Sequence, residues 1–253
     1  MVSLWDYWRR ARTPTARFDA TTGSSTYAIE LTRRAPRISL TAQGAASGTL
    51  RISLTWRMRG SDMMGSRTHR RSFAWRNPLE VFRPPEVVGH TVGIVDVDFD
   101  LACLYEMEDG SKGVVQPLGG LLGDFNGPPY LKLAGDDRFG GGSGEVIYAN
   151  LDHQEKFKRL LVFVYIYDGI PAFEHADVSV TLDATNGMHI EVPLTDPTPQ
   201  ARSCAVIALE HEDGELVARR EVKYVYGFQS EIDRLYGWGM AWGRGTKPSR
   251  LRH

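Results

Sequence analysis

Three short turn signals, each beside segments of alternating apolar and polar residues, constrain the fold of this 253-residue chain most strongly. They are Asp109-Gly110, Asn186-Gly187 and Asp213-Gly214, and the last separates "SCAVIALEH" from "ELVARREVKYVYGF". Such dipeptides favour tight turns between antiparallel strands. Alternation with a period of two places one set of side chains on a buried face. The sequence therefore predicts an all-β fold of antiparallel hairpins, most simply a β-sandwich.

Other segments fit the same architecture. Residues 159–168, "RLLVFVYIYD", are apolar on both faces, which is typical of a central strand covered on both sides. Residues 119–144 are rich in glycine, and we expect little secondary structure there. A short helix is expected near the end of the domain, where Ser230 and Asp233 have the spacing of a capping box.

The charge of the chain is unevenly distributed. The first 90 residues contain 15 Arg, no Lys and six acidic residues, a balance of +9, and residues 91–253 have a balance of −10. We expect a basic N-terminal extension at 1–26 and a sandwich domain at 27–253, with a long insertion at about residues 58–89 that shows no clean period. The basic part could dock on the acidic part of its own chain or on a partner, or could bind nucleic acid or an anionic membrane. We favour docking, because no nucleic-acid-binding module is recognisable.

Several classes of protein are disfavoured by what the sequence lacks. No apolar run approaches the ~18 residues of a membrane span, and no apolar signal-peptide core is evident, so a cytoplasmic protein is expected. Cys103 and Cys204 each lie in an apolar strand-like run, which predicts two structural thiols and no disulfide. The phosphate loop, the nucleophile elbow, the dinucleotide fingerprint and paired metal-binding histidines are all missing, so no enzyme is expected.

The segment "IVDVDFDLACLYEMEDG" carries the main candidate site. Asp96, Asp98 and Asp100 alternate with Val97, Phe99, Leu101 and Cys103, so the carboxylates share the face opposite the core. Carboxylates at ~7 Å repeats repel one another unless water screens them or a cation lies among them. An EF-hand is excluded, because Leu101 and Met107 replace its glycine and its final glutamate.

A second oxygen-rich element is "AGDDRFGGGSGE", which includes Asp136, Asp137 and Glu145. Its glycines would allow backbone carbonyls to turn toward a cation, and calcium accepts 6–8 oxygen ligands from separate segments. The spacing alone does not distinguish a calcium site from a flexible acidic turn.

The order of these elements resembles the TerD family of tellurium-resistance and stress proteins. The resemblance rests on "ISLTAQGAASGTLRISLTW", "DVDFDLACLYEMEDG", "AGDDRFGGGSGEVIYANLD" and "KRLLVFVYIYDG", and the closing "SEIDRLYGWGMAWGRGTK" is closer to the TerA branch. It implies a calcium-binding β-sandwich that is not known as an enzyme fold. The metal ligands it implies here are Asp96, Asp98, Asp100, Asp136, Asp137 and Glu145.

The resemblance also sets expectations about affinity and function. Two acids of the family pattern are missing after Gly144, and Gly141 and Ser143 replace residues that are often acidic, so weaker calcium binding is expected. The resemblance implies a non-enzymatic scaffold or binding component of a bacterial tellurite-resistance and stress-response system. Its expected partners are other Ter-type stress proteins, including a membrane-associated complex. The alternatives are a metal-independent interaction domain, in which the acidic strand is a solvated face, and an Arg-rich nucleic-acid binder.

Overall fold

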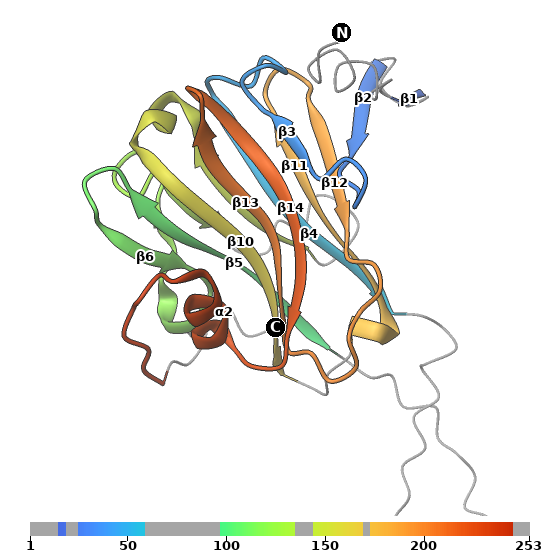
Figure 1. The fold of residues 1–253 in the computed structure, drawn as a ribbon, viewed down its shortest axis with the longest axis vertical. Helices are drawn as coiled ribbons and strands as arrows, with labels where there is room; N and C mark the ends of the chain where they lie inside the picture. Colours follow the sequence, from blue (N-terminus) through green and yellow to red (C-terminus); the bar gives the residue numbers. More distant parts are fainter. Residues whose placement is uncertain (1–14, 19–24, 59–96, 135–143, 169–172, 245–253) are drawn as a thin grey trace, which may run out of the picture.

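The chain folds into two β-sheets packed face to face, which confirms the all-β sandwich (Figure 1). The computed structural model describes residues 15–18, 25–58, 97–134, 144–168 and 173–244. The predicted boundary at residue 26 lies within β2 (Ser25–Glu30), and the predicted insertion after Met58 lies outside the described residues.

The strands of each sheet come from distant parts of the sequence. The first sheet has the order β1 (Thr15–Phe18), β2 (Ser25–Glu30), β12 (His189–Pro193), β11 (Ala176–Ala184), β4 (Thr49–Met58), β9 (Gly144–Asn150), β8 (Leu131–Ala134) and β7 (Gly123–Asp124). The second has the order β3 (Arg37–Ser39), β14 (Glu215–Val225), β13 (Ser203–Glu212), β10 (Phe157–Asp168), β5 (Asp98–Met107) and β6 (Lys112–Val115). Short 3₁₀ turns lie at η2 (Leu118–Gly120), η4 (Leu151–Lys156) and η5 (Phe173–His175), and helix α2 (Gln229–Tyr236) follows β14. All described pairings of these strands are antiparallel except that of β2 with β12.

The three predicted hairpins are confirmed. Asp109-Gly110 joins β5 to β6, Asn186-Gly187 joins β11 to β12, and Asp213-Gly214 joins β13 to β14. Asp213 and Gly214 have φ values of 53° and 82°, the left-handed conformation that a primed hairpin turn requires. The turn chemistry in the sequence therefore determined these connections.

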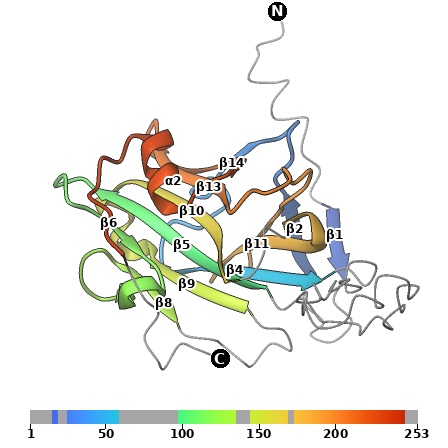
Figure 2. The ribbon, with the colours of Figure 1, turned by 90° about the horizontal axis from the view of Figure 1, so that it is seen from below.

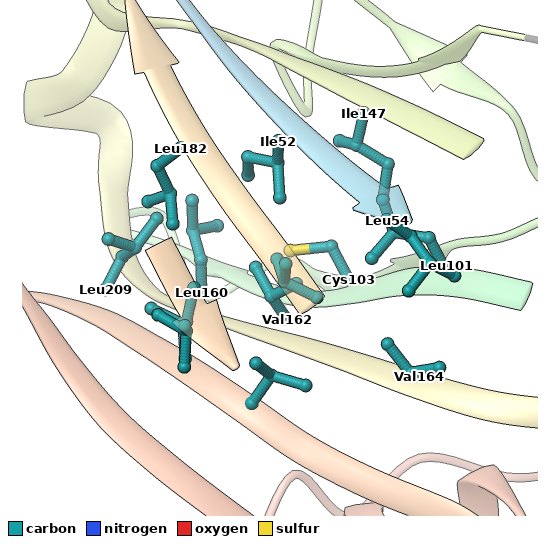
Figure 3. Packing of buried hydrophobic residues seen from close by; sticks show 14 of the residues in the cluster. Ile52, Leu54, Leu101, Cys103, Ile147, Leu160, Val162, Val164, Leu182 and Leu209 are labelled. Atoms are coloured by element: carbon teal, nitrogen blue, oxygen red, sulfur yellow. The ribbon is translucent and has the colours of Figure 1, made fainter. Parts of the chain in front are cut away.

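The core lies between the two sheets. Figure 3 shows Cys103 of β5 among aliphatic side chains, with Ile52 and Leu54 from the first sheet and Val162 from β10 of the second. Strand β10 is buried on both faces, as its continuous apolar run predicted.

A second apolar layer covers the outer face of the second sheet. Figure 2 shows α2 on the side of this sheet that faces away from the first sheet. Ile232 of α2 and Trp238 of the following segment pack with Leu104, Leu161 and Phe163. Both faces of the central strands β5, β10 and β13 are therefore largely buried.

The described residues of 119–144 contain the short strands β7 and β8, of two and four residues, which agrees with the little secondary structure expected there. One expectation about local structure was wrong. Helix α2 is confirmed but has no capping box, since its N-cap is Phe228 and no side chain caps it. In the described part of the chain, no helix has the length and apolarity that a membrane crossing needs.

Candidate acidic site

Strand β5 presents its aspartates to the outer face of the second sheet, as the alternation predicted. Val97, Phe99 and Leu101 belong to the core between the sheets. Asp98 is half-buried, but Asp100 is 0 % exposed. Bulk water therefore does not screen the Asp100 carboxylate, and a simple solvated face does not describe this strand.

Glu145 belongs to the first sheet, and its side chain reaches strand β5 of the second sheet next to Asp100. It lies near the start of β9, and Ile147 and Ala149, on the same side of that strand, belong to the core. Its Oε2 accepts a hydrogen bond from the backbone N–H of Leu101 at 2.6 Å. This bond crosses between β9 and β5 and connects the two acidic elements of the sequence at one end of the sandwich.

Tyr165 completes the described part of the site. It pairs directly with Asp100 across β10 and β5 and is 1 % exposed. Its hydroxyl lies near the Asp100 carboxylate. Burial and then the negative charges of Asp100 and Glu145 raise the pKa of the Tyr165 phenol. A neutral, buried phenol thus lies beside the buried carboxylate of Asp100 and the partly buried carboxylate of Glu145.

The turn at η2 forms one wall of this region. The backbone of Leu118 lies beside the Tyr165 hydroxyl. Its carbonyl accepts a hydrogen bond from the buried side-chain amide of Gln116 at 3.1 Å. The amide of Gln229 on α2 in turn donates to Gln116 at 3.3 Å. These bonds hold the turn in place and connect it to the helix on the outer face.

The structure thus brings two of the six predicted ligands, Asp100 and Glu145, to the same phenol, and it places Asp98 two residues before Asp100 on the same strand. Asp96, Asp136 and Asp137 lie outside the described residues. Within the described ranges, no group of three or more His, Cys, Asp or Glu side chains is arranged to hold a metal ion. The described part of the site supplies carboxylate oxygens, a donor type that calcium prefers, beside a buried phenol. Tyr165 was not predicted as a site residue, because in the sequence it is one of ten residues in the largely apolar run at 159–168.

The basic N-terminal part contacts the acidic part of the chain at three described positions. Arg33 pairs with Asp196 at 3.0 Å, Arg37 pairs with Glu212, and Arg51 lies 3.8 Å from Asp183. The three arginine side chains are 43–72 % exposed, so each pair contributes at most about 1 kcal/mol to stability. The arrangement accords with docking of the basic part on the chain's own acidic part.

Comparison with known proteins gives one informative relative. No protein-family model matches the chain. The chain is 34 % identical over 221 residues to the tellurium resistance protein TerA of Alcaligenes sp.. The matched region covers 87 % of this chain and 58 % of that relative. The similarity supports a relationship to the Ter proteins and agrees with the TerA-like closing segment.

Proposed function

We propose that this chain belongs to the Ter family and acts in a role related to tellurium resistance, as a non-enzymatic calcium-binding scaffold or binding component. The similarity to the TerA of Alcaligenes supports the family and the general role. The chain spans 58 % of the length of that relative, so the activity of the whole relative is carried over here as a proposal.

The observation that carries the calcium proposal is the buried carboxylate of Asp100. A buried carboxylate beside a second acid is costly unless positive charge compensates it. Asp98, Asp100 and Glu145 would hold the ion from the described part of the site, and Asp96, Asp136 and Asp137 would supply the remaining ligands. Bound calcium would neutralise these carboxylates. Glu145 is already oriented by its bond to the Leu101 amide.

The proposed partners are other Ter-type stress proteins, including a membrane-associated complex in the bacterial cytoplasm. The resemblance to the TerD family and the similarity to TerA support this choice. A catalytic role is not proposed.

Thermal melting with and without calcium tests the proposal. A ligand that binds only the folded state stabilises it by about 2.7 kcal/mol at a hundredfold excess over its dissociation constant. Millimolar calcium should therefore raise the melting temperature above that in chelator, and magnesium should raise it less, because it demands octahedral geometry. Asp98→Asn should reduce the calcium effect, while Asp213→Asn, in the β13–β14 turn, should leave it intact.

The alternative is a metal-independent interaction domain. The described residues favour it in one respect, because they hold no complete cluster of metal-binding side chains. Equal melting temperatures in chelator and in calcium, with no heat of calcium binding by calorimetry, would establish this alternative and reject the calcium site.

A further inference from the structure

Tyr165 is buried in the acidic site without being one of the proposed calcium ligands. Strands β10 and β5 lie side by side (Figure 1), and Tyr165 pairs directly with Asp100 across them. Directly paired side chains on one face of an antiparallel pair have Cβ atoms about 4.5–5.5 Å apart. The two residues are 1 % and 0 % exposed, so no bulk water separates the phenol from the carboxylate.

The hydroxyl of Tyr165 reaches both acidic elements of the site. It lies near the carboxylates of Asp100 and Glu145, which come from different sheets, and beside the backbone of Leu118 in η2. A neutral phenol has one O–H to donate, and an ionised carboxylate can only accept. The hydroxyl therefore donates toward the carboxylates, and its oxygen is left to accept from a backbone N–H. This arrangement connects the acidic strand with the turn that forms one wall of the site.

The phenol ring is packed tightly enough to fix the position of this hydroxyl. It belongs to the apolar layer on the outer face of the second sheet, and its centroid lies 6.1 Å from that of the Phe163 ring. Leu161, Ile232 of α2 and Trp238 belong to the same layer. Side chains in a close-packed layer occupy single low-energy rotamers, so the ring confines the hydroxyl to one place beside Asp100.

We infer that Tyr165 is a positioning residue of the proposed calcium site, and that its hydroxyl orients the Asp100 carboxylate for the ion. The inference rests on the calcium proposal and adds to it a residue that sets the affinity. Metal-binding carboxylates are held by hydrogen bonds from outer groups, and removing such a group typically weakens metal binding about 10- to 100-fold. A carboxylate held by the phenol loses less rotational freedom on binding the ion, because its rotation is already restricted.

A purely structural role of the phenol predicts a different result. If the hydroxyl only offset the buried charge of Asp100, its loss would lower stability without changing the affinity for calcium. Tyr165→Phe separates the two roles, because it keeps the ring and its packing and removes only the hydroxyl. The matched control is Tyr236→Phe. The Tyr236 hydroxyl also donates to a carboxylate, that of Glu221 at 2.8 Å, and neither residue is a proposed calcium ligand.

Calorimetric titration of calcium into the metal-free full chain measures the affinity. Tyr165→Phe should raise the dissociation constant about tenfold or more, and Tyr236→Phe should leave it unchanged. Circular dichroism of each variant checks that it is folded. Tyrosine difference absorption gives a second readout, which the wild type alone already provides. Calcium should change the absorption of the wild type and of Tyr236→Phe, because it neutralises charge beside the Tyr165 ring, and should change that of Tyr165→Phe much less.

Failure of this inference is distinct from failure of the calcium proposal. A wild type that binds calcium with no change in tyrosine absorption would overturn the inference and leave the calcium site in place. The same conclusion would follow if Tyr165→Phe had the dissociation constant of the wild type, or if both variants weakened binding equally. A wild type that gives no heat of calcium binding would reject the calcium proposal and the inference with it.

Discussion

The strongest electrostatic prediction concerns Glu106, which is buried on β5 among three cations. Its side chain is 6 % exposed and accepts hydrogen bonds from Lys158 Nζ at 2.8 Å and Arg159 Nε at 2.7 Å, and Lys112 lies 3.5 Å away. The pKa of Glu106 falls from 4.5 to about 2, and the hydrogen bond from Lys158 is the largest cause. Burial opposes this change, but the contacts with Arg159 and Lys112 lower the pKa further. Glu106→Gln keeps the shape of the side chain and removes its charge.

The expected loss of stability follows from the change in pKa. A carboxyl whose pKa falls from 4.5 to about 2 on folding contributes about 3 kcal/mol at neutral pH. The Lys158 side chain is 54 % exposed, so screening by water reduces the expected loss to about 2 kcal/mol. Because the folded-state pKa is lowered, this contribution is present above pH 4.5 and is lost as the pH falls through about 2.

Urea unfolding of the wild type and Glu106→Gln at pH values between 7 and 3 measures the difference. The gap between the two proteins should be about 2 kcal/mol at pH 7 and should narrow steadily below pH 4.5. The control is Glu108→Gln, an exposed carboxylate on the same segment, which should change stability by less than about 0.5 kcal/mol. A gap that is absent at pH 7, or that stays constant down to pH 3, would refute the electrostatic account.

Two further predictions concern buried groups. Asp233 accepts hydrogen bonds from the backbone amides of Gly239 and Met240 and from Trp242 Nε1, at 2.8–2.9 Å. Asp233→Ala should therefore lower the free energy of unfolding by about 2–3 kcal/mol and shift tryptophan emission to the red, because the segment after α2 loosens. Unchanged emission would contradict this role. Cys103 and Cys204 are 0 % exposed, and burial raises the pKa of both thiols, that of Cys103 to about 12, so a polar thiol reagent should label neither until urea unfolds the protein. Rapid labelling of either thiol in the folded chain would show that its strand opens.

The sequence by itself determined the features that depend on neighbouring residues. The hairpins follow from turn dipeptides such as Asp213-Gly214, whose left-handed backbone suits few other residues. The core face of β5 follows from strict alternation, because successive side chains on a strand point to opposite faces. The thiols of Cys103 and Cys204 were placed correctly for the same reason.

Only the tertiary structure decided which acids are buried and what lies beside them. Alternation places Asp98 and Asp100 on one face, but the cover over that face comes from η2 and from α2 with its following segment. The contact of Glu145 with Leu101 joins two sheets, and the position of Tyr165 beside Asp100 depends on the pairing register of β10 with β5. Local patterns fix the faces of a strand, whereas burial and register depend on strands distant in sequence.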